Sequence, residues 1–332
     1  MKYSERLGEL SNEQFQKALD TFNLGKFVKA EPISQGLFGQ NVYITSDKGE
    51  FVLRGKPHYD WQFPNEKLMA ESLHEKTKVP VPFPYLLETN KDILGWEFIL
   101  MPRMKGKNLS DSLSEDWLSD VERIEIAKAQ GSTLREAQKL TYEYCGKFDL
   151  TTNSIKAYTP DWFTEFSRQI LERLEKSTQY NDKTPQSDIE WVKELIEQAK
   201  ASIEEFTPCF YMQDYKPGNM VVDKVEGKWQ VTGLFDLMEA SFGHPESDIS
   251  RMFAVYIEKG RKDLAYAFVN TYLQRNINID KFVNRFPLFM LHDRSIIWEW
   301  VQRTNRVWWD KNWTFKDWMS TFIHINKGSI IL

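Results

Sequence analysis

The sequence predicts an α+β fold of two lobes. The N-terminal lobe, residues 1–104, is built on an antiparallel sheet, and the larger C-terminal lobe, residues 105–332, is mainly helical. Three observations predict this division. Short apolar runs separated by tight turns fill residues 27–54, as in an antiparallel meander. Apolar residues beyond 115 recur mainly at helical spacing. The chain of 332 residues also exceeds one average domain.

The first lobe begins with a short helix and a meander. Residues 11–14 read Ser-Asn-Glu-Gln, a capping box that predicts the helix start. Strands are predicted at 27–34, 41–45 and 51–54. The loop after the first strand contains Gly36 and Gly39, and glycines allow the close backbone approach that nucleotide phosphates require. Hairpin turns need glycine too, so the two glycines alone do not distinguish a phosphate loop from a turn.

A helix and two further strands complete the first lobe. The amphipathic helix begins at Glu66, and Val-Pro-Val-Pro at 79–82 ends it, because proline does not continue a helix. The strands are predicted at 85–87 and 96–101, and residues 102–106 form the hinge. Beyond the hinge, six segments carry apolar residues at helical spacing and are predicted helices: 115–140, 161–174, 188–203, about 252–257, 264–272 and about 286–309.

One hairpin interrupts the helices and carries the most informative residues. Apolar runs at 220–222 and 229–235 flank Glu-Gly, a hairpin turn. Asp214 and Asn219 precede the first run, and Asp236 follows the second. The order is that of a catalytic base and two magnesium ligands in phosphoryl-transfer enzymes. The hairpin places Asn219 at the mouth of one strand and Asp236 at the exit of its partner, so that both can reach one hard cation. Alone, such residues would be ordinary turn residues.

The segment 210–251 resembles the aminoglycoside phosphotransferase family, small-molecule kinases related to protein kinases. The family pattern H-x-D-x-x-x-x-N is here Met-Gln-Asp-Tyr-Lys-Pro-Gly-Asn at 212–219. The later family motif runs from Phe-Asp at 235–236 through Gly-His-Pro at 243–245 to Asp248. The resemblance extends from about residue 27 to 318, although the final third matches only in helical character. It implies a bilobal protein-kinase-like fold, ATP or GTP as phosphate donor, and Mg²⁺.

The chain departs from the family pattern at three positions. Met212 stands where the family has His, so some other contact must hold the loop. Lys216 stands where the family often has His, and its ammonium can reach a phosphate as a point charge. His244 replaces an Asp and is expected to be structural. Asp248 is expected either to cap the helix that it begins or to brace the catalytic loop.

The resemblance also implies residues that bind the nucleotide. The family's third strand ends in V-L-R or V-L-K, and that cation contacts the α- and β-phosphates while pairing with a Glu of the next helix. Arg54 and Glu66 are the matching pair, with Glu71 as the alternative partner. Met101 and Met104 near the hinge suit a slot for the base, although methionine commonly fills core gaps.

The acceptor site is expected in the aromatic C-terminal part. Indole faces and carboxylates together suit a cationic or sugar-like ligand, whereas Trp at helical spacing is ordinarily core. The candidate acceptor residues are Glu239, Trp298, Glu299, Trp309 and Asp310.

Three functions follow. The first is transfer of the γ-phosphate of a nucleoside triphosphate to a hydroxyl of an aminoglycoside or another antibiotic, with Asp214 as the base. The second is the same transfer to a metabolic small alcohol, such as a choline-like amino alcohol, a sugar or an amino-acid alcohol. The third is a non-catalytic nucleotide-binding module, suggested by Met212 and disfavoured because Asp214, Asn219 and Asp236 are all present.

Composition excludes some partners. The formal net charge of −5 gives no basic field that would attract nucleic acid. Cys145 and Cys209 are too few for a disulfide framework. The sequence shows neither a long apolar run nor a signal-peptide core at its start. We therefore expect a cytoplasmic protein without a membrane partner.

Overall fold

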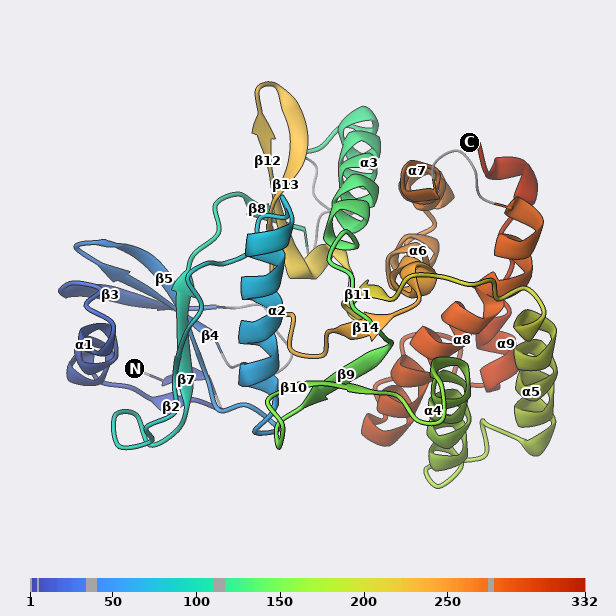
Figure 1. The fold of residues 1–332 in the computed structure, drawn as a ribbon, viewed down its shortest axis with the longest axis horizontal. Helices are drawn as coiled ribbons and strands as arrows, with labels where there is room; N and C mark the ends of the chain where they lie inside the picture. Colours follow the sequence, from blue (N-terminus) through green and yellow to red (C-terminus); the bar gives the residue numbers. More distant parts are fainter. Residues whose placement is uncertain (1, 5, 34–40, 110–116, 274–277, 332) are drawn as a thin grey trace. The chain divides into compact units, whose positions relative to one another are not determined.

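The computed structural model describes residues 2–4, 6–33, 41–109, 117–273 and 278–331. The chain divides into two compact units, and Figure 1 labels its helices and strands. Unit 1 comprises Met1–Ser112, Phe148–Ser154 and Pro217–Ala240, and unit 2 comprises Leu113–Lys147, Ile155–Lys216 and Ser241–Leu332. Antiparallel sheets and helices occur together, so the predicted α+β class is confirmed. None of the helices within the described ranges has both the length and the apolar character needed to cross a membrane.

Unit 1 is built on a five-stranded antiparallel sheet of order β3-β4-β5-β7-β6. The predicted meander and both further strands are present. The strands are β3 (Phe27–Pro32), β4 (Asn41–Ser46), β5 (Gly49–Gly55), β6 (Leu86–Glu88) and β7 (Phe98–Pro102). Two short strands, β1 (Lys2–Ser4) and β2 (Gly8–Glu9), pair with each other at the N-terminus.

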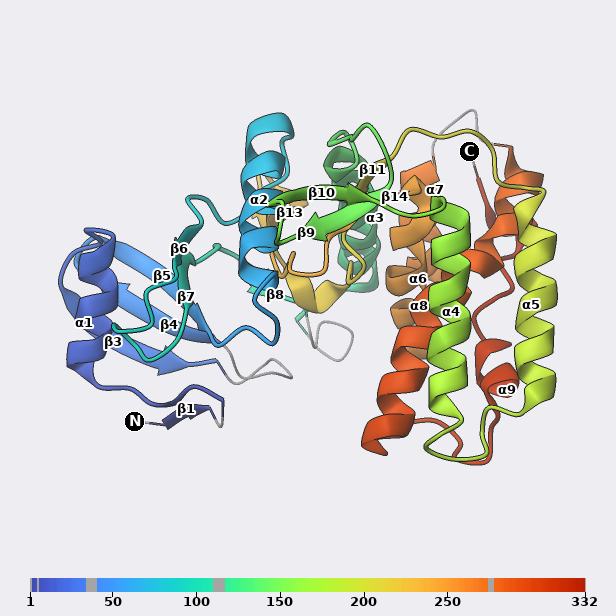
Figure 2. The same ribbon diagram turned by 60° about the horizontal axis from the view of Figure 1, so that its bottom comes forward.

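Helix α1 (Asn12–Thr21) covers one face of this sheet and closes the core of unit 1 (Figures 1 and 2). It begins with the predicted capping box: Ser11 Oγ accepts from Gln14 N at 3.2 Å, and Gln14 Oε1 accepts from Ser11 N at 3.0 Å. Phe15 and Leu19 are fully buried against Val42 of β4 and other apolar sheet residues. The helix therefore forms because its start is capped and its apolar face is covered.

The hairpin lies in a separate three-stranded sheet of order β13-β12-β8. Strands β12 (Met220–Val225) and β13 (Lys228–Leu234) join through Glu226 and Gly227, with φ of 51° and 78°. Positive φ at both positions is what a two-residue turn of this kind requires. The predicted hairpin is therefore present.

The hairpin groups with unit 1, whereas the sequence analysis assigned it to a second domain beginning at residue 105. The reason is that β8 (Lys107–Asn108), just after the predicted hinge, pairs with β12. Gly233 of β13 allows a close approach, because a Cβ at that position would lie only 2.6 Å from Cβ of Met104. Pairing of β8 with β12 thus places the hairpin in the same compact unit as the N-terminal sheet.

Unit 2 is mainly helical, as predicted. Helices α4, α5 and α8 lie side by side (Figure 2), and α3 packs against α7. The helices are α3 (Asp120–Ala137), α4 (Trp162–Ser177), α5 (Gln186–Lys200), α6 (Ile249–Glu258), α7 (Lys262–Leu273), α8 (Ile279–Thr304) and α9 (Phe315–Met319).

Two features of the C-terminal part differ from the prediction. Helix α8 begins at Ile279, where Asn278 caps it, and ends at Thr304, whereas the predicted helix ran from about Phe286 to about Trp309. A four-stranded sheet of order β10-β9-β14-β11 accompanies the helices. The prediction of helices alone was wrong here, because strands of three or four residues are too short to show alternation. They are β9 (Gly146–Asp149), β10 (Ser154–Ala157), β11 (Cys209–Tyr211) and β14 (Ser241–Gly243).

Candidate functional site

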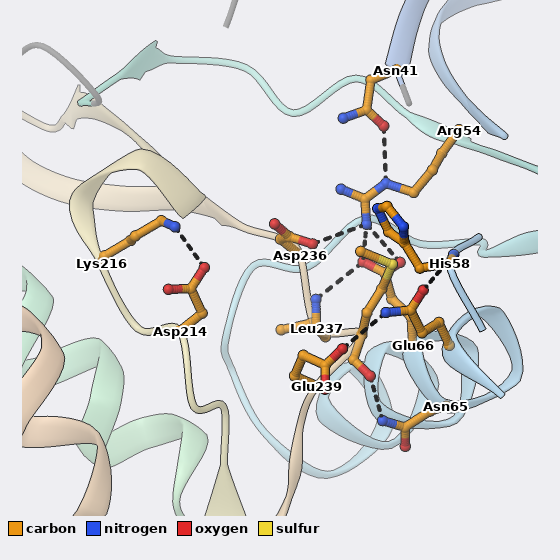
Figure 3. A network of polar contacts seen from close by, with 12 residues as sticks. Asn41, Arg54, His58, Asn65, Glu66, Asp214, Lys216, Asp236, Leu237 and Glu239 are labelled. Carbon is orange, nitrogen blue, oxygen red and sulfur yellow. Dashed lines mark hydrogen bonds and ion pairs between the residues drawn. The ribbon is translucent and has the colours of Figure 1, made fainter. Parts of the chain in front are cut away.

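The polar centre of unit 1 is built around the guanidinium of Arg54 (Figure 3). Arg54 lies near the end of β5 with 4% of its surface exposed. Its Nη1 donates to Glu66 Oε1 at 2.8 Å and to Glu66 Oε2 at 2.7 Å. Its Nε donates to Oδ1 of Asn41, its register partner on β4, at 2.9 Å. Arg54 thus pairs with Glu66 of helix α2 (Gln62–Lys76), whereas the alternative candidate Glu71 pairs with Lys67.

Asp236 joins the same centre from the end of the hairpin. Arg54 Nη1 donates to Asp236 Oδ1 at 3.2 Å. Glu66 Oε1 also accepts from the backbone N–H of Leu237 at 3.0 Å. The carboxylate of Glu66, on helix α2, therefore contacts both Arg54 of β5 and the backbone of the segment after the hairpin. Asp236 itself has φ of 69° and a side chain that is 31% exposed, so its carboxylate remains accessible to solvent.

The charges of this centre stabilise one another. Burial acts to lower the pKa of Arg54, but the carboxylates of Glu66 and Asp236 outweigh burial and hold that pKa above its ordinary value. Arg54 is therefore a permanent cation inside the protein. Because a buried charge is tolerated only when it is paired, the centre depends on both carboxylates.

Helix α2 holds the segment after the hairpin through further contacts that the sequence analysis missed. Asn65 Nδ2 donates to the carbonyl oxygens of Met238 at 2.8 Å and Ala240 at 2.9 Å. Gln62 Nε2 donates to Glu239 Oε1 at 2.9 Å. Residues 62, 65 and 66 share one helix face, and all three are buried. Helix α2 begins at Gln62, ahead of the predicted start at Glu66, so Gln62 and Asn65 lay outside the predicted helix.

Asn219 lies beside Asp236 across the hairpin. Its backbone oxygen accepts from Phe235 N at 3.0 Å, and only 6% of the surface of Asn219 is exposed. The turn η1 (Pro217–Asn219) is fixed by Asn108 Nδ2, which donates to the oxygens of Gly218 at 2.9 Å and Met220 at 3.2 Å. The predicted placement at the mouth and exit of two paired strands is therefore the one observed.

The oxygen donors of Asn219 and Asp236 fit a magnesium ion that is bound together with a nucleotide. Mg²⁺ prefers oxygen ligands, and it is commonly held by one or two carboxylates together with waters and phosphate oxygens. Over the residues that the structure describes, no group of three or more His, Cys, Asp or Glu side chains could hold a metal ion by itself. Two oxygen donors alone would leave the other positions around such a cation to waters and phosphate oxygens.

Met101 and Met104, predicted to form a slot for the nucleotide base, are both described. Met101 is buried in β7, and Met104 contacts the hairpin where Gly233 leaves room for it. Both side chains lie at or just beyond the end of the strand that pairs with β5. Gly36 and Gly39 lie outside the described residues.

The polar centre of unit 2 is built around the carboxylate of Asp214. Lys216 Nζ donates to Asp214 Oδ2 at 2.6 Å (Figure 3). Arg251 of α6 brings Nε to 3.4 Å from Asp214 Oδ1. The side chain of Asp214 is 27% exposed. Arg251 was missed by the sequence analysis, because it is 37 residues from Asp214 along the chain and belongs to no motif.

The loop that carries Asp214 is braced through its backbone. Asp248 Oδ2 accepts from Met212 N at 2.7 Å, and Asp248 Oδ1 accepts from Gln213 N at 2.9 Å. Of the two roles predicted for Asp248, the structure shows bracing. Because backbone N–H groups make these bonds, they do not require a histidine at position 212, where the Met212 side chain is fully buried. Burial raises the pKa of Asp248 to about 7, although both backbone N–H groups act to lower it.

The candidate acceptor residues occupy ordinary structural positions. Trp298 is fully buried, and its Nε1 donates to Thr184 Oγ1 at 2.9 Å. Trp309 stacks on it with ring centroids 5.5 Å apart. Glu299 pairs with Lys176 at 3.2 Å and with Arg303 at 3.1 Å, and Asp310 Oδ1 accepts from the backbone N–H of Asn312. Glu239, the fifth candidate, belongs to unit 1.

Comparison with known proteins identifies a family. The model of the phosphotransferase enzyme family matches residues 29–281. Acyl-CoA dehydrogenase family member 11 from Rattus norvegicus is 24% identical over 225 residues, which is 66% of this chain. The chain spans only 26% of the length of that protein.

Solved structures share the fold over nearly the whole chain. A thermostable mutant of aminoglycoside phosphotransferase APH(4)-Ia is 14% identical, with a TM-score of 0.63 over 95% of this chain and 96% of that one. The GDP and kanamycin complex of APH(2")-IIIa is 16% identical, with a TM-score of 0.60 over 94% of this chain and 96% of that one. At such low identity these likenesses show the fold alone.

Proposed function

The chain belongs to the phosphotransferase enzyme family, and we propose that it transfers the γ-phosphate of ATP or GTP to a hydroxyl of a small molecule. The observation that carries the proposal is the buried cation of unit 1. Arg54 is fixed by Glu66 and touches Asp236, which follows the hairpin on which Asn219 also lies. A fixed strand cation beside an oxygen-donor pair is the arrangement that positions nucleotide phosphates in kinase-like enzymes.

Each residue has a role that its surroundings support. Arg54 is always charged and rigidly held, so it suits the non-transferred phosphates. Asn219 and Asp236 would hold a magnesium ion, which when bound neutralises charge on phosphate oxygens. Asp214 has a partly exposed carboxylate, so it can orient the acceptor hydroxyl and take its proton. Positioning and electrostatic stabilisation supply most of the catalysis in such transfers.

The first acceptor class that we propose is an aminoglycoside or another antibiotic. One of the similar solved structures is described as a kanamycin complex, which supports this class by analogy alone.

A metabolic small alcohol is the second candidate, and two observations favour it. Glu299 already pairs with Lys176 and Arg303, and Asp310 closes its own turn, so these acids are engaged rather than gathered for a polycation. The relative from Rattus norvegicus is also named as an acyl-CoA dehydrogenase family member rather than as an antibiotic kinase.

A panel of acceptors tests the proposal. The protein is incubated with Mg²⁺ and ATP or GTP against aminoglycosides, macrolides, choline-like amino alcohols, sugars and amino-acid alcohols, and nucleoside diphosphate release is measured. We expect acceptor-dependent release that is lost in Asp214→Asn. Release that is equally fast in Asp214→Asn would contradict the assignment of the base, and silence across the panel would favour a non-catalytic nucleotide-binding module.

A further inference from the structure

The carboxylate of Asp214 is held between two cations that differ in kind. Lys216 lies two residues along the same loop, and its side chain is 33% exposed. Arg251 comes from helix α6, and its side chain is 10% exposed. Each cation approaches a different oxygen of the carboxylate, Lys216 at Oδ2 and Arg251 at Oδ1. The exposed contact is flexible and screened by water, whereas the buried one is fixed by its surroundings.

Arg251 lies one helical turn beyond Asp248, the residue that braces the loop. Asp248 accepts from the backbone N–H groups of Met212 and Gln213. Arg251 contacts the side chain of the next residue, Asp214. Because Asp248 and Arg251 are three positions apart, they lie on the same side of the chain at the start of α6. The same helical turn therefore fixes both the backbone of the loop and the carboxylate that the loop presents.

A second carboxylate shares the charge of Arg251. Arg251 Nε lies 2.8 Å from Asp293 Oδ1 and 3.4 Å from Asp214 Oδ1. Within the described residues this Nε makes no aligned hydrogen bond, so the cation is held between two carboxylates by charge. Asp293, on helix α8, is itself fixed, because Arg294 Nε and Nη2 both contact its Oδ2, at 2.8 Å and 2.6 Å.

We propose that Arg251 is a positioning residue for the phosphoryl-transfer reaction: it fixes the carboxylate of Asp214 and keeps it ionised. Asp293 competes with Asp214 for the positive charge of Arg251 and so weakens this effect. This rests on the proposed function, in which Asp214 receives the proton of the acceptor hydroxyl. The proton moves from that hydroxyl to Asp214 as the oxygen–phosphorus bond forms and the bond to the leaving diphosphate breaks. An ionised, correctly oriented carboxylate is what this step requires.

Opposite substitutions follow from the shared charge. The charged groups around Asp214 include Lys216 on its own loop, Arg251 on α6 and Asp248 just before α6, and Asp293 on α8 acts through its contact with Arg251. Arg251→Met removes a cation beside Asp214 and leaves Asp293 paired with Arg294 but no longer with Arg251, so protonation of Asp214 becomes easier. Asp293→Asn removes an anion that competes with Asp214 for Arg251, so protonation of Asp214 becomes harder. The two variants therefore move the same titration in opposite directions.

Carboxyl carbon NMR of the full chain labelled at aspartate measures this directly, with Asp214 assigned by the resonance that Asp214→Asn loses. We expect its titration midpoint to move to higher pH in Arg251→Met and to lower pH in Asp293→Asn. Arg285→Met is the matched control, because Arg285 is also a buried cation of unit 2, paired with Glu246. The control is expected to destabilise the protein without moving the Asp214 midpoint. An unmoved midpoint in both test variants overturns the proposal, as does an equal shift in the control.

Magnesium-dependent hydrolysis of ATP, with water in place of the acceptor, separates this inference from the proposed function. Arg251→Met is expected to lower the rate constant about tenfold or more at unchanged KM for ATP, with Arg251→Lys recovering most of it. Hydrolysis lost in Asp214→Asn but unchanged in Arg251→Met overturns the positioning role and leaves the proposed function standing. Hydrolysis that is equal in wild type and Asp214→Asn contradicts the proposed function, and the NMR titration then still decides whether Arg251 controls Asp214.

Discussion

The polar centres of the two units use opposite arrangements of charge. In unit 1 a cation, Arg54, is surrounded by acceptors and is almost fully buried. In unit 2 a carboxylate, Asp214, is approached by two cations and is 27% exposed. This difference agrees with the ligand that each centre would bind in the proposed reaction. A buried and fully paired cation is suited to hold phosphates in one geometry, whereas an accessible carboxylate is suited to meet acceptors that come and go.

Breaking the unit 1 centre is expected to give the largest effect. Glu66→Ala leaves Arg54 buried without its bidentate partner, so the free energy of unfolding should fall by about 3–5 kcal/mol. Urea denaturation at pH 7.5 measures the loss. Glu71→Ala, on the same helix, is the matched control, because Glu71 pairs with the half-exposed Lys67. The control should lose less than about 1 kcal/mol. Similar losses in the two variants would show that the Arg54 centre is not held by buried charge.

The accessible member of the unit 1 centre should affect ligand binding more than folding. Asp236→Ala removes one of the two oxygen donors proposed for magnesium, so the affinity for ATP in the presence of Mg²⁺ should fall by at least the roughly 10- to 100-fold that is typical of residues that orient metal ligands. Titration of a fluorescent ATP analogue with Mg²⁺ or with EDTA measures the change. Asp223→Ala is the control, because Asp223 is an exposed acid on β12 of the same hairpin. An affinity in Mg²⁺ that is the same for Asp236→Ala and Asp223→Ala would remove Asp236 from the metal site.

Much of the unit 1 centre could be predicted from the sequence, because its members lie in short motifs. Asn219 and Asp236 flank a hairpin that two apolar runs and a Glu-Gly turn indicate. Arg54 and Glu66 were indicated by the resemblance of the third strand and the following helix to the family pattern. What the sequence did not reveal there is Asn65, whose contacts with Met238 and Ala240 connect segments more than 170 positions apart.

The unit 2 centre was less predictable, because its support is non-local. Asp214 stood out by its motif, but Arg251 and Asp293 come from separate helices. Strand β11 leads into the loop of Asp214, and β14 precedes helix α6. Each is only three residues long, and the two pair across some thirty intervening residues. An alternation of apolar and polar residues was therefore too short to be recognised. At Trp298 the sequence analysis predicted a function that the structure does not support. The aromatic-rich segment suggested a binding surface, but the indole is fully buried in the core.

The buried polar support of unit 2 includes neutral histidines, which makes it sensitive to acid in a way that the Arg54 centre is not. Burial, with the nearby Arg285 as a smaller cause, lowers the pKa of His244 to about 3. Its Nδ1 accepts from Glu246 N at 3.2 Å, so the neutral ring is the form that the fold uses. Because the unfolded chain takes up the proton near pH 6.5, stability is lost as pH falls from 6.5 toward 3.

This acid sensitivity gives a prediction of intermediate size. Between pH 7.5 and 5, His244 should account for about 2 kcal/mol of lost unfolding free energy. His244→Asn keeps an acceptor for Glu246 N but does not titrate, so its stability should fall by that much less over the same interval. Urea denaturation of both proteins at the two pH values measures the difference. Parallel losses in wild type and variant would show that His244 is protonated in the folded protein or is not buried.

The smallest expected effect concerns the exposed cation of the unit 2 centre. Lys216 contacts Asp214 at 2.6 Å, but both side chains are about one-third exposed, so water screens the pair. Lys216→Met should lower the rate of phosphoryl transfer only a few-fold and leave the free energy of unfolding nearly unchanged, since exposed ion pairs contribute less than about 1 kcal/mol. Steady-state kinetics and urea denaturation measure both quantities beside Arg251→Met, whose cation is buried. A loss of activity in Lys216→Met as large as that in Arg251→Met would mean that Lys216 contacts the transferred phosphate itself, and the difference between an exposed and a buried cation at Asp214 would then have to be abandoned.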